Sequence, residues 1–325
     1  IADLEDILAR PERRYAIIKE EMGELKQTFG DERRTEISDE DLSDLDMEDL
    51  IPEEEIVITI THKGYIKRTP LEEYKSQRRG GKGLRGMDTK DEDFLVDLFV
   101  CSTHDWIMFF TTKGRAYWLK GYKIPAGGRH AVGRPIVNMI ERLEQGEHVK
   151  AILPIREFDD EHFLFFATRE GLVKKTVLSA YSRPTIAGIN AIKLREGDSL
   201  VGVRLTDGNQ EIILASQYGQ ANRFEESEVR PMGRVASGVR GMKFKHPNDV
   251  VVSMAVVEEG QRLLTITENG YGKRSEVEDY RKTHRGSSGV ITIKSNFRNG
   301  PVIAVLPVWD TDEIILTSRE GMIIR

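Results

Sequence analysis

A repeat of about 50 residues constrains the fold of this 325-residue chain more than any other feature of its sequence. From residue 56 onward, each unit opens with an apolar run, then Thr or Ser, two polar residues and a glycine, a pattern typical of a β-hairpin turn. The six turn glycines are separated by 50, 57, 48, 51 and 51 residues: Gly64, Gly114, Gly171, Gly219, Gly270 and Gly321. A second glycine, here called the landmark glycine, follows each of the first five by 17 to 19 residues: Gly83, Gly133, Gly188, Gly238 and Gly289.

Each unit closes with another short apolar run, at residues 94–100, 149–155, 200–205, 250–256 and 302–308. Four short strands per unit and almost no helix indicate a ring of blades that resembles a propeller, in which each blade buries its faces against its neighbours. Residues 56–325 are therefore predicted to be all-β. The sixth unit stops at Arg325, after its first hairpin, so the sixth blade is expected to be incomplete.

The charge is divided unevenly along the chain. The net charge is −6, but residues 1–55 contain 20 acidic and 7 basic residues, which leaves 34 acidic and 41 basic residues in 56–325. We expect a helix from residue 9 to about 29 within a segment 1–36, and an extended acidic linker over 37–55, with a solvated amphipathic helix as the alternative for the linker. The linker is also a candidate competitor of DNA for the basic domain.

Basic residues recur four positions after the turn glycines, at Arg68, Lys175, Arg223, Arg274 and Arg325, while the second unit has Trp118 there. Others cluster before or just after the landmark glycines. A position that repeats around a ring falls on one rim, so these charges are predicted to form an arc, although a single basic residue at a strand end is commonly just solvated. A curved band of cations matches duplex DNA that bends around the rim through phosphate contacts.

The loop Gln77–Gly83 holds three cationic side chains and three glycines in seven consecutive residues. Glycines let successive backbone N–H groups converge on one concavity, which suits phosphate oxygens. The loop lacks the Gly-Lys-Ser/Thr spacing of a mononucleotide-binding P-loop. We predict that it clamps one end of the bent duplex.

Catalytic and membrane functions find no support in the sequence. The seven histidines show no pair at metal-ligand spacing, and Cys101, the single cysteine, is expected to be buried. The chain has no apolar run of about 18 residues and no secretory signal in its first twenty residues, which favours the cytoplasm.

Gln77–Gly83 resembles the gyrase-A box, the diagnostic motif of the C-terminal domain of DNA gyrase A subunits, and its flanks Ile60–Arg68 and Leu84–Met87 resemble the same first blade. The likeness extends over the whole chain, with the first residues resembling the end of the preceding breakage-reunion domain. The predicted DNA-binding residues are Gln77, Arg78, Arg79, Gly80, Gly81, Lys82, Gly83 and Arg85 in the first unit's loop, with Lys67, Arg68, Arg134, Lys174, Lys175, Arg183, Arg223, Arg234, Arg240, Lys273, Arg274 and Arg285 in the blades.

The resemblance implies a six-bladed β-pinwheel whose blades exchange strands, preceded by a helix and an acidic linker. It implies that DNA wraps around the basic edge, so that strand passage introduces negative supercoils. The catalytic tyrosine lies outside this chain, ATP and Mg²⁺ are used elsewhere in the holoenzyme, and no catalytic residue, metal or cofactor is expected here.

The implied partners are duplex DNA, the B subunit of gyrase and a second A subunit, with a monomeric fragment, in the nucleoid-associated bacterial cytoplasm. The fifth unit's Thr283–Gly289 is a degenerate box with one cation in its core, so the blades are not expected to contribute equally. Two alternatives are the equivalent domain of topoisomerase IV, which lacks an intact box, and a propeller that binds proteins.

Overall fold

The chain forms two compact units, Ile1–Asp49 and Leu50–Arg325. The computed structural model describes residues 1–31, 48–73, 93, 95–128, 130–140, 142–144, 146–314, 316–317 and 323–324. The loop Gln77–Gly83, Arg85, Arg325 and most of the predicted linker lie outside these described residues.

The first unit contains two helices, α1 (Ala2–Ala9) and α2 (Pro11–Phe29). Pro11 occupies the first turn of α2, where its missing N–H costs no helical hydrogen bond. The predicted helix from residue 9 to about 29 corresponds to α2, and α1 is an additional helix. The Arg13 guanidinium ties the two together through Asp3 and Asp6, at 2.8 and 2.9 Å.

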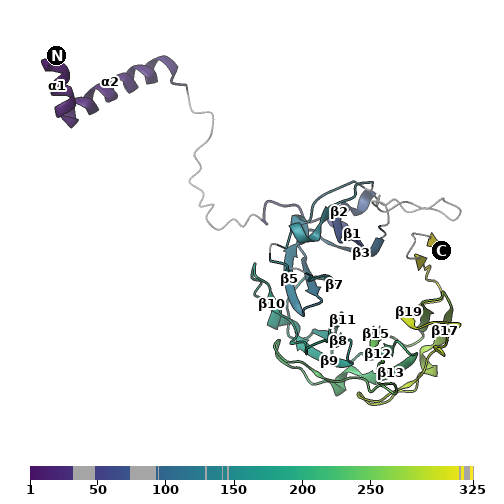
Figure 1. Ribbon diagram of the computed structural model, residues 1–325. Coiled ribbons are helices and arrows are strands. Elements are labelled where there is room, and N and C mark those ends of the chain that lie inside the picture. Colours follow the sequence, from purple (N-terminus) through teal and green to yellow (C-terminus); the bar gives the residue numbers. More distant parts are fainter. Residues whose placement is uncertain are drawn as a thin grey trace. The chain divides into compact units, whose positions relative to one another are not determined.

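The second unit is a succession of antiparallel sheets, which we call blades (Figure 1). Blade one has the order β3-β1-β2-β6: β1 (Glu55–Thr61), β2 (Tyr65–Pro70), β3 (Leu95–Ser102) and β6 (Arg134–Pro135). Blade two has the order β10-β5-β4-β7: β4 (Trp106–Thr111), β5 (Arg115–Lys120), β7 (Val149–Ile155) and β10 (Ile189–Asn190). Blade three has the order β11-β8-β9-β14: β8 (Phe163–Thr168), β9 (Leu172–Val177), β11 (Leu200–Thr206) and β14 (Val239–Arg240).

Blade four has the order β15-β12-β13-β18: β12 (Glu211–Ser216), β13 (Gln220–Glu225), β15 (Val251–Val257) and β18 (Val290–Ile291). Blade five has three strands among the described residues, in the order β17-β16-β19: β16 (Arg262–Thr267), β17 (Gly272–Glu276) and β19 (Val302–Val308). A two-stranded sheet of β20 (Leu316–Thr317) and β21 (Ile323–Ile324) follows. The all-β propeller is thus confirmed with five blades, and the predicted count of six is not.

Short 3₁₀ turns accompany the strands: η2 (Leu71–Glu73), η3 (Gly121–Lys123), η4 (Ile136–Asn138), η5 (Leu178–Tyr181), η6 (Glu226–Glu228) and η7 (Val277–Asp279). Four of them, η3, η5, η6 and η7, follow the second strand of a unit directly. From there the chain leaves its own blade and runs to the blade before it. These 3₁₀ turns therefore mark where strand exchange begins.

The hydrophobic core lies between successive blades. In β4, Ile107 and Phe109 pack toward blade one, whereas Met108 and Phe110 pack toward blade three. Alternate residues of a strand point to opposite faces of the sheet, so a strand with a blade on each side must be apolar at every position. This arrangement explains why the first strands read as continuous apolar runs in the sequence.

The last strand of each unit lies on the inner side of the curve that the blades follow (Figure 1). β7 packs beside β11, β11 beside β15, and β15 beside β19. The short strands β6, β10, β14 and β18 lie at the opposite edge of their sheets. The exchanged strands therefore form the outer edge of the propeller.

Candidate nucleic-acid interface

Strand exchange brings the two repeated glycines of the sequence together at the outer edge. The short strand that follows each landmark glycine pairs with the second strand of the preceding blade, as in Val239 opposite Val173. The carbonyl oxygen of the preceding unit's turn glycine accepts a hydrogen bond from the residue three positions after the landmark glycine. The N–H of Ile136 donates to Gly64 at 2.8 Å, and that of Thr292 donates to Gly219 at 2.9 Å.

The landmark glycines are required by this close approach. Gly238 has φ +95°, and a Cβ there would lie 2.4 Å from the Val173 carbonyl oxygen. Gly289 has φ +65°, and a Cβ would lie 1.9 Å from the carbonyl oxygen of Ala221. Both the backbone conformation and the contact exclude a side chain. The spacing seen in the sequence is therefore the spacing of strand exchange.

Arginines from successive units are exposed on the exchanged segments. Arg134 lies in β6, Arg240 in β14, and Arg183 in the segment that leads to β10. Within the described residues, none of these three guanidinium groups has an ion pair or a hydrogen bond. Arg234 is half-buried, and its guanidinium likewise has no such partner in the described part of the chain. Strand exchange thus places several available positive charges on the outer edge.

Three of the predicted DNA-binding lysines are instead buried, which contradicts direct contact with phosphates. The ammonium group of Lys67, 0% exposed, donates to the Gly128 carbonyl oxygen at 2.8 Å. Lys174, also 0% exposed, donates to the carbonyl oxygens of Ala191 and, at 2.5 Å, of Arg234. Gly128 and Arg234 belong to the segment that arrives from the next unit, so these lysines fasten the exchanged chain to the blade.

Burial also changes the protonation of Lys174. Removal from water lowers the pKa of its ammonium group to about 7, and the positive charge of Arg234 acts in the same direction. The amine lies over the Phe166 ring, 5.3 Å from its centroid. No carboxylate is hydrogen-bonded or ion-paired to this amine among the described residues. Lys174 is therefore a structural group that is close to neutral at physiological pH.

The cations at the fourth position after the turn glycine bind the following unit. Arg68 donates from Nε to the Ile124 carbonyl oxygen at 2.8 Å, and Arg223 donates to that of Val277 at 2.8 Å. Lys175, 4% exposed, lies 3.7 Å from the fully buried carboxylate of Glu226. The predicted arc at this register is therefore largely a set of ties between blades.

The fifth unit differs at these two positions. Lys273 is exposed, and its ammonium group has no hydrogen bond or ion pair within the described segments. Arg274 is exposed and pairs with Asp310 at 3.1 Å. Arg285 is exposed and contacts blade four through Glu228.

A second set of cations was missed by the sequence reasoning. Lys193, Lys243 and Lys294 lie five residues after their landmark glycines, and all three are exposed without a side-chain partner among the residues described. Counting onward from the landmark glycines would have identified them, since the same offset holds in three consecutive units. They add a row of charge to the exchanged segments.

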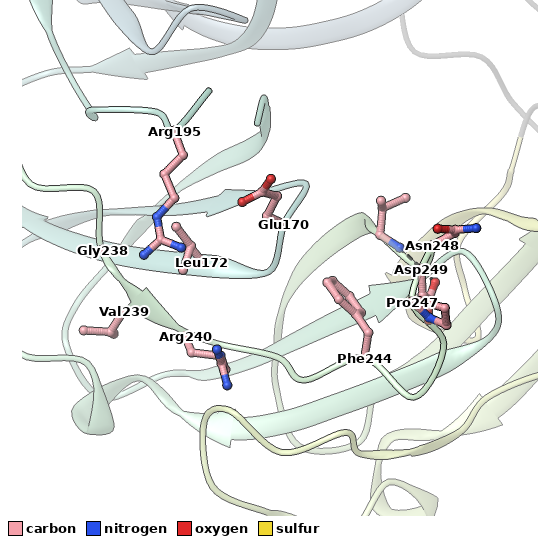
Figure 2. Close-up of a pocket in the computed structure, with 11 residues that line it drawn as sticks. Glu170, Leu172, Arg195, Gly238, Val239, Arg240, Phe244, Pro247, Asn248 and Asp249 are labelled. Atoms are coloured by element: carbon pink, nitrogen blue, oxygen red, sulfur yellow. Dashed lines mark hydrogen bonds between the residues drawn. The ribbon is translucent and has the colours of Figure 1, made fainter. Parts of the chain in front are cut away.

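A pocket of about 660 Å³ opens where the third and fourth units meet (Figure 2). Arg240 from β14 and Arg195 from the chain that precedes β11 line it, with Phe244 and Asp249 across from them. Asp249 is engaged by the Ser216 hydroxyl at 2.7 Å and the Tyr218 N–H at 3.0 Å, so it caps the hairpin turn. Glu170 also lines the pocket, so its charge is mixed and it does not by itself select an anion.

Among the described residues, no helix is long and apolar enough to cross a membrane, and no group of three metal-ligating side chains is gathered at one place. Cys101 is buried as expected, and burial raises the pKa of its thiol to about 12. The thiol is therefore protonated and unreactive at neutral pH.

Comparison with known proteins identifies relatives over the whole length. The family model of the DNA gyrase C-terminal domain, a β-propeller, matches residues 55–102, 105–156, 162–207, 210–258 and 261–308. The DNA gyrase A subunit of Staphylococcus epidermidis is 44% identical over 327 residues, which cover 100% of this chain and 36% of that protein. The chain therefore spans about a third of the length of this curated relative.

Two solved structures share the architecture. The C-terminal domain of a DNA topoisomerase IV matches with a TM-score of 0.72 and 29% identity, covering 84% of each chain. The C-terminal domain of a DNA gyrase A matches with a TM-score of 0.66 and 30% identity, covering 83% of this chain and 88% of that one.

Proposed function

Because the chain belongs to the family of DNA gyrase A subunits through its C-terminal propeller domain, we propose that it binds duplex DNA and wraps it around the outer edge of its blades. The observation that carries this proposal is the placement of Arg134, Arg183 and Arg240 by strand exchange in successive units. They are exposed and have no acidic partner in the described structure. Phosphate contacts of this kind are nearly independent of base sequence.

The wrap requires contacts along several blades. Bending a site of 20–30 base pairs by 40–90° costs on the order of 1–6 kcal/mol. Cations distributed over successive units can offset this cost, because each one meets a different part of the bent duplex. The row of Lys193, Lys243 and Lys294 supports such a path.

The relatives' sequences favour a gyrase over a topoisomerase IV. The topoisomerase IV domain has the higher TM-score of the two solved structures, but architecture is shared by both enzymes and does not separate them. Identity of 44% over the whole chain with the A subunit of a gyrase, together with the intact loop Gln77–Gly83, supports the gyrase assignment.

In the whole enzyme, wrapping presents one duplex segment over another, so that strand passage introduces negative supercoils. The proposal assigns ATP hydrolysis to the B subunit, the catalytic tyrosine to another part of the A subunit, and Mg²⁺ to the holoenzyme rather than to this chain. The partners are the gyrase B protein and a second copy of the A protein, in an assembly of two copies of each. The chain alone is a monomer, and the enzyme works on the bacterial nucleoid in the cytoplasm.

A sixth blade is also part of the proposal, as is the division into residues 1–36, 37–55 and 56–325. Half-exposed Leu264 and Ile266 on β16, and exposed Val96 and Leu98 on β3, support further packing at both ends of the blade series. Hydrogen exchange should find the amides of β20 and β21 protected, and rapid exchange there would contradict a sixth blade. Limited proteolysis should cut first within 37–55.

Affinity for a linear duplex at rising salt tests the DNA proposal. The plot of log affinity against log salt should fall with a slope of about −0.9 for each phosphate neutralised. A nearly flat plot would contradict the proposal and favour a protein-binding propeller. Sealing nicked DNA in the presence of the chain then reports wrapping, because a wrapped path changes the linking number of the product.

The loop Gln77–Gly83 remains a proposed clamp on the strength of its sequence. Replacing all seven residues by alanine should weaken wrapping and, in the full enzyme, abolish negative supercoiling while sparing strand passage. Relaxation activity serves as the control for an intact enzyme. An alanine-substituted enzyme that supercoils normally would show that the clamp lies elsewhere.

A further inference from the structure

The segment that the fifth unit contributes to blade four is held by acidic side chains. The Lys282 ammonium group contacts Glu211 at 2.5 Å and Glu225 at 2.9 Å. Arg285 donates from its backbone N–H to the Glu228 carboxylate at 3.0 Å and from Nε to the Glu228 carbonyl oxygen at 3.0 Å. Two cations of this segment are therefore already engaged within the protein.

Glu211 and Glu225 are ionised when they hold Lys282. Hydrogen bonding to Lys282 is the main cause that lowers the pKa of the Glu225 carboxyl. Burial raises the pKa of Glu211, but hydrogen bonds from Lys282 and Arg223 outweigh burial and leave it below its ordinary value. The contacts at Lys282 are thus full ion pairs at neutral pH.

The preceding blade lacks these acids. Counted from the turn glycines, Glu225 and Glu228 correspond to Val177 and Ala180 of blade three. Arg234 occupies the position of Arg285, four residues before its landmark glycine, and its guanidinium has no ion pair in the described structure. The same place on the outer edge therefore presents an available cation on blade three and an engaged one on blade four.

We infer that Glu225 and Glu228 take the place of DNA phosphates at the fifth unit's segment, so that the wrapped duplex is gripped along the second to fourth units and released at the fifth. This inference rests on the proposed DNA wrapping. A phosphate can bind Lys282 or Arg285 only by displacing a carboxylate, so the contact gains less than one made by an unpaired cation. The side chains of Lys282 and Glu225 are 46% and 51% exposed, which leaves the pair open to competition by DNA.

The test is a salt titration of linear duplex binding by the 325-residue chain and by its Glu225→Gln/Glu228→Gln variant. Each released cation that meets a phosphate should steepen the slope by about 0.9, which widens the ratio of affinities at 50 and 200 mM salt by about threefold. The variant should also bind more tightly than the wild type at the lower salt concentration.

A matched control is Glu258→Gln/Glu259→Gln. It changes the net charge equally, in the exposed turn between β15 and β16, where neither carboxylate has a side-chain partner in the described chain. Adding Arg285→Gln to the Glu225/Glu228 variant should remove part of the gain, because one of the released cations is then missing. Circular dichroism of each variant verifies that the blades are intact.

The outcomes separate the two proposals. If the wild type shows no salt-dependent binding, the DNA function itself fails. If the wild type binds but the Glu225/Glu228 variant binds no more tightly than the wild type, or no more tightly than the control variant, the release point is refuted while DNA binding stands. Tighter binding and a steeper slope in the Glu225/Glu228 variant alone support it.

Discussion

Replacing Lys174 by methionine should change how the stability of the propeller depends on pH. The ammonium group is 0% exposed, and its pKa falls from 10.5 to about 7. Below pH 7 the group is charged in both the folded and the unfolded protein, and folding bears the full cost of burying the charge. As pH rises from 7 toward 10.5 the folded state binds fewer protons than the unfolded state, so stability increases.

The magnitude follows from the size of the shift. One pKa unit corresponds to about 1.4 kcal/mol, so the full window is worth about 5 kcal/mol as an upper limit. Between pH 7 and 9.5 the free energy of unfolding of the wild type, relative to Lys174→Met, should rise by about 3 kcal/mol. Methionine has a similar length and no charge, so the variant lacks this contribution at every pH.

Urea unfolding at several pH values, followed by tryptophan fluorescence, measures the difference between the two proteins. Groups that titrate elsewhere cancel in this difference. Lys273→Met is the matched control, because Lys273 occupies the same position after its turn glycine but is exposed, and its difference from the wild type should not vary with pH. A pH-independent difference for Lys174→Met would refute the assignment of a buried, nearly neutral amine.

Two further substitutions test the contacts between blades. Gly289→Ala should cost about 2–4 kcal/mol, from positive φ and a clash with the Ala221 carbonyl oxygen, whereas Gly270→Ala, with φ +80° but open space, should cost about 1–2 kcal/mol; equal losses in urea unfolding would contradict the close approach. Glu226→Gln leaves the buried Lys175 without its charge partner and should cost about 3–5 kcal/mol, partly restored by Lys175→Met in the same chain. A loss below about 1 kcal/mol would show that this pair is unimportant.

The blade architecture could be predicted because its signals are local. A hairpin turn needs a residue with positive φ, and the sequence supplies a glycine there in each unit, as at Gly171 with φ +80°. The closing runs at 149–155 and 302–308 coincide with β7 and β19, because a strand buried on its faces must be apolar throughout. The exchanged strands are only two residues long and carry no periodicity, so their pairing was implied by the family resemblance alone.

The roles of the basic residues could not be predicted in the same way. Lys174 and Lys273 occupy the same position in the repeat, yet one is buried and the other exposed. The difference depends on the carbonyl oxygens that each amine meets, and those of Arg234 come from a segment 60 residues away. A repeat in sequence fixes where a side chain begins, whereas its environment is set by a neighbouring unit that need not repeat the same chemistry.

Strand exchange also sets the order in which the blades can mature during synthesis. Blade one ends its own three strands at Ser102, but its fourth strand is Arg134–Pro135. At a translation rate of 5–20 residues per second, the ribosome needs about 2–6 s to make that interval. During this time the outer edge of β2 has no partner strand and can pair with another nascent chain. Each blade is sealed only by its successor, so one vulnerable edge moves along the nascent protein from the N-terminal blade toward the C-terminal one.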